Sequence, residues 1–181
     1  MELRGRAHKL GDHINTDYIV SAKYKARISD IKELATHIME DLDPEFYSRI
    51  RPGDFIVAGE NFGSGSSRET APLVIREAGI AAVLAKSFAR IFFRNAINVG
   101  LPVAVCDTDA IEDGDVLRVD LARGQVINES RGGVLSIAPL PPLMQEILQD
   151  GGLEAHFKKH GGFRGMSAAT AREGNGGELA G

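Results

Sequence analysis

A glycine-rich segment, Gly59–Glu69, separates a short apolar run from a helical pattern and limits the folds open to this chain. The apolar run, Phe55–Ala58, is typical of a buried strand. A strand, a glycine turn and a helix in this order gather free backbone N–H groups and the positive end of a helix dipole. The turn also carries Ser66, Ser67 and the guanidinium of Arg68. The segment therefore predicts a site for an anionic substrate beside two hydroxyls.

Two familiar glycine-loop sites do not fit this segment. A phosphate-binding P-loop requires a lysine directly after its last glycine, and none follows Gly65. A hydrolase nucleophile elbow needs glycines two residues before and two residues after the serine, and none of Ser64, Ser66 and Ser67 has both. A purely structural role, in which a serine caps the following helix, stays open.

Apolar periodicity along the chain predicts alternating strands and helices. The expected strands are 3–8, 55–58, 81–85, 103–105, a hairpin over 115–127, and 134–138. The expected helices are 31–38 with Asp30 as N-cap, a turn over 44–46, one from the Gly/Ser loop to Gly79, 87–98, and a closing helix over 141–148. A strand–helix–strand–helix–strand core with added β elements indicates an α/β fold.

Composition indicates one globular domain and excludes several kinds of partner. The chain has 181 residues, 43% of them hydrophobic, and a net charge of −4, which argues against nonspecific nucleic-acid binding. No apolar run reaches the ~20 residues that span a membrane, and Met1–Arg6 has no apolar signal core. We expect a cytoplasmic protein with a domain over 1–162 and a mobile, Gly/Ala-rich tail over 163–181.

The cysteine and histidine content excludes some sites and leaves others unsupported. Cys106 is the single cysteine, so the chain has neither an internal disulfide nor the several thiolates of an iron–sulfur cluster, and we expect Cys106 to be buried. His156 and His160 have i, i+4 spacing, but with lysines between them we interpret them as a solvated helix end, not a metal site. Arg90 and Arg94, one helical turn apart, are interpreted as solvated or structural.

Three long segments, in the same order, resemble the swivelling domain of the aconitase superfamily. They are the Gly-Ser-Ser-Arg-Glu signature at 65–69, the Thr-Asp motif within Gly11–Val20, and the Lys-Ser-Phe-Ala-Arg-Ile motif within Ala85–Pro102. The likeness runs from Leu3 to about Gly162. Length and order match the free-standing small subunits of this superfamily, such as those of 3-isopropylmalate dehydratases. The resemblance implies a single β/β/α swivelling domain with an added β-hairpin.

The resemblance also implies roles for residues of the loop. Ser66 corresponds to the base that removes a proton from the carbon next to a carboxylate, Ser67 to a hydrogen-bond donor, and Arg68 to the substrate-carboxylate ligand. Asp17 corresponds to an acid that lines the site, although an Asp that bonds nearby amides in a turn fits equally well. A serine is a poor base in water, so it needs helix N–H groups and arginines that stabilise its alkoxide.

A further loop, Tyr24–Arg27, corresponds to the position that distinguishes substrates in this superfamily. Relatives acting on carboxylate-bearing side groups tend to have arginine at its third residue, where this chain has Ala26. A small apolar residue suits an alkyl group such as isopropyl. Lys25 and Arg27 flank it, and the sequence leaves open whether either points toward the substrate or into solvent.

The resemblance thus predicts the small subunit of a hydro-lyase, active only with a large subunit that carries a [4Fe-4S] cluster. The expected activity is isomerisation of a hydroxy-diacid, 2-isopropylmalate to 3-isopropylmalate, by dehydration and rehydration in leucine biosynthesis. The alternatives are a homoaconitase-like or 2,3-dimethylmalate-like hydro-lyase subunit, and a non-catalytic assembly module. The presence of both Ser66 and Arg68 argues against the last of these.

Overall fold

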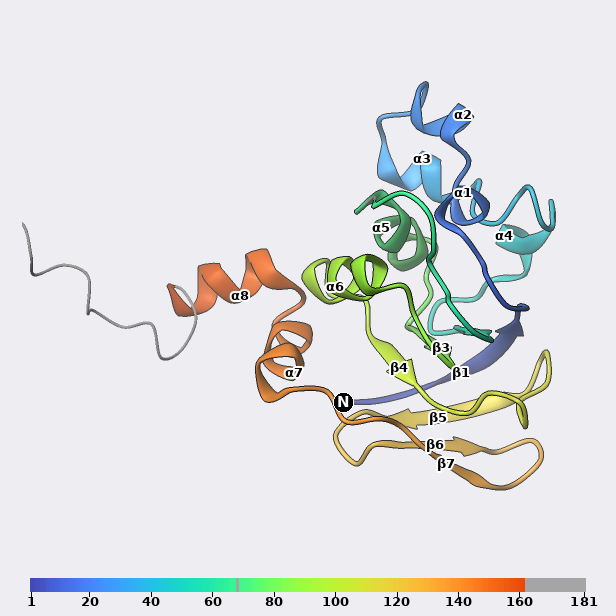
Figure 1. The fold of residues 1–181 in the computed structure, drawn as a ribbon, viewed down its shortest axis with the longest axis vertical. Coiled ribbons are helices and arrows are strands. Elements are labelled where there is room, and N and C mark those ends of the chain that lie inside the picture. The colour runs from blue at the N-terminus through green and yellow to red at the C-terminus, as the bar shows by residue number, and fades with distance from the viewer. Residues whose placement is uncertain (68, 162–181) are drawn as a thin grey trace, which may run out of the picture.

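Strand β1 (Glu2–Lys9) joins two differently built halves of one sheet (Figure 1). The computed structural model describes residues 1–67 and 69–161, and their strands follow the order β4-β3-β2-β1-β5-β6-β7. Strands β1 to β4 are parallel, and β5 to β7 continue from β1 in antiparallel fashion. Their bounds are Phe55–Ala58 (β2), Ala82–Ala85 (β3), Val103–Val105 (β4), Val116–Asp120 (β5), Gln125–Asn128 (β6) and Val134–Ser136 (β7). The predicted tail, 163–181, lies outside the described residues.

The two ends of β1 pair with different halves of the sheet, and because of this divided pairing the sheet is curled. The first part pairs antiparallel with β5, where Gly5 stands opposite Leu117, and the last part pairs parallel with β2, where Ala7 stands opposite Phe55. A Cβ atom at Gly5 would lie 2.1 Å from the Gly53 carbonyl oxygen, so only glycine allows this close approach. The curl lets the antiparallel half cover one face of the parallel half.

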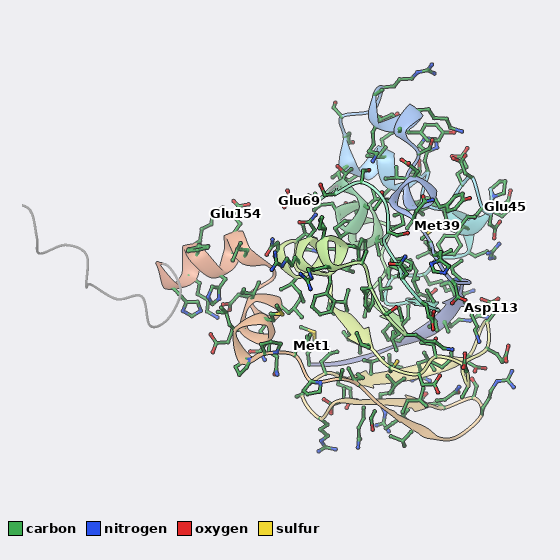
Figure 2. All side chains as sticks on the ribbon, in the orientation of Figure 1. Met1, Met39, Glu45, Glu69, Asp113 and Glu154 are labelled. Atoms are coloured by element: carbon green, nitrogen blue, oxygen red, sulfur yellow. The ribbon has the colours of Figure 1, made fainter. Side chains whose placement is uncertain are left out.

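Strands β2 and β3 are buried on both faces, as their continuous apolar runs predict. In β2, Ile56 and Ala58 pack in the cluster beneath the helices, whereas Phe55 and Val57 pack with side chains of the antiparallel half such as Leu117. Side chains fill both spaces (Figure 2). The order of layers is therefore helix, parallel strands, antiparallel strands, which confirms the predicted α/β fold of the β/β/α type.

The predicted helices form with different limits, and the described residues form three further helices that were not predicted, two short ones after β1 and one at the end. The helices are Thr16–Ile19 (α1), Ala22–Lys25 (α2), Ile31–Ala35 (α3), Phe46–Arg49 (α4), Thr70–Glu77 (α5), Arg90–Asn98 (α6), Pro142–Gln149 (α7) and Leu153–His160 (α8). Helix α6 begins at Arg90, not at the predicted residue 87, because Phe88 forms an isolated parallel bridge with Phe62. The prediction that α7 closes the fold is wrong, because α8 follows after Gly151 and Gly152, both at positive φ.

Two local expectations are confirmed, the capping of α3 by Asp30 and the burial of Cys106. The Asp30 side chain accepts a hydrogen bond from the Lys32 amide and caps α3, although that helix ends at Ala35. Cys106 is 6% exposed, and burial raises the pKa of its thiol to about 11, which makes it a buried small hydrophobe and not a reactive thiol. Within the described residues, no helix is long and apolar enough to cross a membrane.

Candidate functional site

Backbone pairing brings the Gly/Ser loop beside the Thr-Asp motif. The Thr16 amide donates to the Ser64 carbonyl at 2.8 Å, and the Gly63 amide donates to the Ile14 carbonyl at 2.7 Å. These bonds form an isolated parallel bridge between Asn15 and Ser64, 49 positions apart in sequence. The start of α1 is therefore held against the loop by main-chain hydrogen bonds, which do not depend on the side chains at these positions.

The third motif is attached to the same loop from its other side. The Phe62 amide donates to the Ser87 carbonyl at 3.0 Å, and the Ala89 amide donates to the Phe62 carbonyl at 2.9 Å. The Ser87 hydroxyl accepts a further bond from the Asn61 amide at 2.8 Å. The three motifs that carry the resemblance thus meet at one place, although each belongs to a different βα unit of the chain.

An aromatic cluster supports the loop from below. Phe62 has no exposed surface, and its ring centroid lies 5.2 Å from that of Phe92 and 6.0 Å from that of Phe88. Gly63, at φ 81°, passes so close that a Cβ atom there would lie 2.2 Å from the Phe92 ring. A side chain at position 63 would have to displace this ring, so the glycine is required for the close packing of loop and α6.

Both predicted serines are exposed at the top of this loop, and neither caps a helix. Helix α5 begins at Thr70 and has Glu69 as its N-cap, so the structural alternative of a serine cap is wrong. The Thr16 hydroxyl donates to the Ser66 carbonyl at 3.2 Å and lies 3.4 Å from the Ser66 hydroxyl oxygen. The serines precede the first turn of α5, instead of belonging to it, which leaves Ser66 and Ser67 accessible to a ligand.

A pocket of about 300 Å³ opens beside these serines. Its described lining residues come from all three motifs: Thr16, Gly63, Gly65, Ser66, Ser67, Ala89, Arg90, Ile91 and Phe92. Arg90, expected to be solvated or structural, is exposed and forms part of this wall, whereas Arg94 one turn later does not line it. Arg68, the predicted carboxylate ligand, lies outside the described residues.

In the sequence, only their positions within the motifs pointed to Arg90 and Thr16 as residues of the site. Arg90 is the first residue of α6 and Thr16 the first of α1, so both side chains stand where a chain segment turns from the loop cluster into a helix. Asp17 is exposed on α1, and the turn-forming role left open for it belongs to Asn15, whose Oδ1 accepts from the Tyr18 amide at 3.0 Å. Asp17 is absent from the described pocket lining.

The predicted specificity loop, Tyr24–Arg27, overlaps the end of α2 and is held by a neighbouring carboxylate. The Tyr24 hydroxyl donates to Glu40 at 2.7 Å, and His37 Nδ1 lies 2.5 Å from the other Glu40 oxygen. The rings of Tyr24 and His37 stack with centroids 3.8 Å apart. Hydrogen bonds from Tyr24 and His37 lower the pKa of Glu40, so the carboxylate is ionised at neutral pH and anchors α2.

The three residues expected to distinguish between substrates, Lys25, Ala26 and Arg27, differ in solvent exposure. Ala26 and Arg27 are exposed, and Ala26 ends α2 as its C-cap. Lys25 is half-buried, and its ammonium nitrogen has almost no exposed surface. None of the three belongs to the described lining of the pocket beside Ser66.

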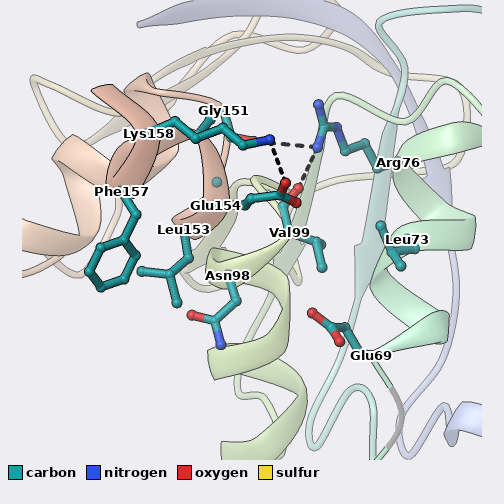
Figure 3. A pocket seen from close by; sticks show the side chains of 12 residues that line it. Glu69, Leu73, Arg76, Asn98, Val99, Gly151, Leu153, Glu154, Phe157 and Lys158 are labelled. Carbon is teal, nitrogen blue, oxygen red and sulfur yellow. Dashed lines mark hydrogen bonds and ion pairs between the residues drawn. The ribbon is translucent and has the colours of Figure 1, made fainter. Parts of the chain in front are cut away.

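A larger pocket, about 670 Å³, lies between α5, α6 and α8 and is lined in part by Glu69, Asn98 and Val99 from the motif segments (Figure 3). The Arg76 guanidinium donates to the Val99 carbonyl at 2.5 Å and to the Gly151 carbonyl at 3.5 Å, which ties α5 to the ends of α6 and α7. Lys158 pairs with Glu154 along the outer rim. Neither of the two serines lines this pocket. The smaller pocket holds both predicted serines and is therefore the candidate site.

Comparison with known proteins agrees with this architecture. Residues 9–107, which hold all three motifs, match the family model of the aconitase C-terminal domain. The solved structure of 3-isopropylmalate dehydratase (LeuD) from Methanocaldococcus jannaschii superposes with a TM-score of 0.85 at 47% identity, covering 88% of this chain and 95% of that one.

Sequence relatives extend the likeness to nearly full length. The 3-isopropylmalate dehydratase small subunit 2 of Archaeoglobus fulgidus is 56% identical over 164 residues, 91% of this chain and 99% of that protein. The methanogen homoaconitase small subunit of Methanothermobacter thermautotrophicus is 49% identical over 157 residues, covering 87% and 91%. This chain therefore belongs to the aconitase C-terminal domain family, in the branch of free-standing small subunits that includes both of these proteins.

Proposed function

We propose that this chain is the small subunit of a 3-isopropylmalate dehydratase, which interconverts 2-isopropylmalate and 3-isopropylmalate by dehydration and rehydration in leucine biosynthesis. The observation that carries the proposal is the meeting of three family motifs around one small pocket that holds Ser66, Thr16 and Arg90. Near-full-length relatives with this activity in their names support it. A cytoplasmic location stays a prediction from the sequence.

In this proposal Ser66 removes the proton from the carbon next to a substrate carboxylate. Ser67 donates a hydrogen bond to the substrate, and Arg68 binds a carboxylate through its planar pair of N–H donors. Arg90, in the wall of the same pocket, adds positive charge where the serine alkoxide and the enolate-like charge develop. The neighbouring Thr16 hydroxyl orients the Ser66 backbone and lies close to its side-chain oxygen. Asp17 is proposed to line the site from α1.

The residues of this chain do not fit an iron–sulfur cluster. A cluster is held by several thiolates, and the one cysteine, Cys106, is buried with its thiol pKa raised to about 11. We therefore propose that the [4Fe-4S] cluster of the enzyme belongs to a large subunit, as the names of the relatives as small subunits imply. Removal of the substrate hydroxyl is assigned to that partner, and proton transfer and carboxylate binding to this chain.

The isolated chain is expected to lack dehydratase activity and the visible absorbance of an iron–sulfur cluster. The measurement is turnover of 3-isopropylmalate, with iron content and absorbance, after anaerobic reconstitution of this chain alone and together with a large subunit. Activity should appear only in the mixture. Stoichiometric iron and sulfide in the isolated chain would contradict the division of roles between two subunits.

A homoaconitase-like activity is the second candidate, because the named homoaconitase small subunit is nearly as similar as the dehydratase subunits. The two substrates differ in the group they carry, alkyl in one case and carboxylate-bearing in the other. A buried arginine without a partner is costly beside an alkyl group, whereas a buried carboxylate needs such a partner. We propose that Ala26 and the flanking Lys25 and Arg27 determine which of these two groups the enzyme accepts. Glu40 supports the assignment by fixing α2 through Tyr24.

The substitution Ala26→Arg is expected to lower kcat/KM for 3-isopropylmalate and raise it for a homoaconitate-type substrate. The change in their ratio should be about 10–100-fold, the discrimination that single pocket contacts provide. Both substrates are measured with the same large subunit. Ala22→Arg is the matched control, because it places the same charge at the exposed start of α2.

If the ratio of kcat/KM for the two substrates is unchanged in Ala26→Arg, this loop does not determine substrate specificity. A wild-type enzyme that already prefers the carboxylate-bearing substrate would show instead that Lys25 or Arg27 pairs with it and that the homoaconitase-like function is correct. A shift of equal size in Ala22→Arg would assign the effect to charge on α2 in general, and would contradict a specific role for position 26.

A further inference from the structure

Two histidines and an aspartate converge where α7 and α8 meet, far in sequence from the motifs of the proposed active site. His156 Nδ1 lies 2.8 Å from Asp150 Oδ2, and His160 Nε2 lies 2.9 Å from the same oxygen. All three atoms lie within 4.8 Å of one another. The prediction of a solvated helix end is wrong here, because the side chain of His156 has no exposed surface and that of His160 is only 15% exposed.

The backbone presents these three side chains from two helices joined by a tight turn. Asp150 is the C-cap of α7, and Gly151 and Gly152, at φ 90° and 121°, reverse the chain into α8. His156 and His160 are four residues apart in α8, so their side chains lie one above the other on the same face. The geometry is therefore determined by main-chain structure before any ligand binds.

The donor set is the kind that binds zinc and neighbouring divalent metals. Imidazole nitrogen and carboxylate oxygen are both common Zn²⁺ ligands, with bond lengths of about 2.0–2.2 Å. A tetrahedral ion with such bonds separates its ligand atoms by about 3.3 Å, so the observed 2.8 and 2.9 Å require only a small outward movement of the rings. Both rings direct a nitrogen at the same Asp150 oxygen, and because the three donor atoms lie up to 4.8 Å apart, an ion would also draw the two ring nitrogens toward each other.

Access and charge are also suitable for a cation. A pocket of about 220 Å³ opens beside the cluster and is lined by Glu146, Gln149, Asp150, Lys159 and His160. Lys159 lies 2.6 Å from the other Asp150 oxygen, with 64% of its side chain exposed, so its ammonium group can move into solvent. Glu146, one turn before Asp150 on α7, adds a second carboxylate at the pocket.

We propose that Asp150, His156 and His160 form a binding site for one divalent transition-metal ion, with zinc as the model ion, that fastens α8 to α7. Water or Glu146 completes the coordination from the pocket side. This site is separate from the proposed catalytic pocket, whose described lining it does not share. Its role is to stabilise the end of the domain, and it takes no part in the dehydration chemistry.

The proposal is tested on the full, untagged chain by equilibrium dialysis against Zn²⁺ alone and by the visible absorption of bound Co²⁺. Wild type should bind one ion per chain, and Zn²⁺ should raise its Tm. His160→Gln removes one ligand at the partly exposed position and should weaken binding by at least about tenfold. His13→Asn is the matched control, because it removes an exposed histidine elsewhere and asparagine tolerates the positive φ of 55° at that position.

A second variant separates a metal site from a cluster held only by hydrogen bonds. Lys159→Met removes the cation that competes for Asp150, so it should tighten Zn²⁺ binding several-fold while leaving all proposed ligands in place. This test remains valid even where His160→Gln fails to fold. Wild type without stoichiometric Zn²⁺ binding, equal affinity in His160→Gln and His13→Asn, or weaker binding in Lys159→Met would each overturn the proposal.

Discussion

Ser66→Ala should lower kcat of the assembled enzyme by about 10²–10³-fold. The substitution removes the group proposed to accept the substrate proton, and losing one contact made in the transition state costs about 3–4 kcal/mol by analogy with a single oxyanion-hole donor. Stability should be nearly unchanged, because the Ser66 side chain is exposed and its backbone carbonyl still accepts from Thr16. The measurements are kcat and KM for 3-isopropylmalate with a saturating large subunit, together with thermal unfolding.

Two further variants sharpen this test. Arg68→Lys keeps the positive charge but loses the planar fork, so it should also cripple the enzyme, with a larger share of the loss in KM. Ser48→Ala is the matched control, since Ser48 is an exposed serine on α4 whose hydroxyl bonds to Glu45 within its own turn. Near-normal kcat in Ser66→Ala, with unchanged unfolding, would remove Ser66 from the role of base. A comparable loss in Ser48→Ala would show that the assay reports stability and not catalysis.

Phe62→Ala should destabilise the domain by about 3–5 kcal/mol, the range for aromatic-to-alanine changes in a core. Phe62 is fully buried, and its ring packs against those of Phe88 and Phe92, so truncation leaves a cavity in the core. For a domain of this size the expected fall in Tm is about 6–20 °C. The measurement is thermal and urea unfolding of the isolated chain.

Tyr47→Ala is the control for Phe62→Ala, because it removes a ring of similar size that is 41% exposed on α4. This variant should change stability by less than about 1 kcal/mol. Equal losses in the two variants would contradict the argument that the ring beneath the Gly/Ser loop is a core element. A stable Phe62→Ala protein would show that the loop is held by its main-chain bonds to Ile14 and Ser87 alone.

Local pattern was enough to predict most of the sheet. The run Phe55–Ala58 forms a strand with the predicted limits, and the alternation over 115–127 forms the predicted hairpin of β5 and β6. Such patterns are readable because burial on one or both faces imposes a side-chain period that neighbouring residues reveal. Helix limits were predicted less well. Residues 87–89 belong to a loop bonded to Phe62, and no local signal reports a partner that distant.

The sequence by itself determined the family, the α/β class and the identity of Ser66, Ser67 and Arg68 as the candidate site, because these depend on residue types at fixed spacing. Only the tertiary structure decided what surrounds them. Main-chain bonds between separate βα units place Thr16 and Arg90 beside the serines, and Glu69, not a serine, occupies the N-cap position of α5. The burial of His156 against Asp150 was likewise hidden, since it depends on how a glycine turn folds one helix back on another. Spacing along a chain records local geometry, whereas contact between distant segments arises only when the whole core packs.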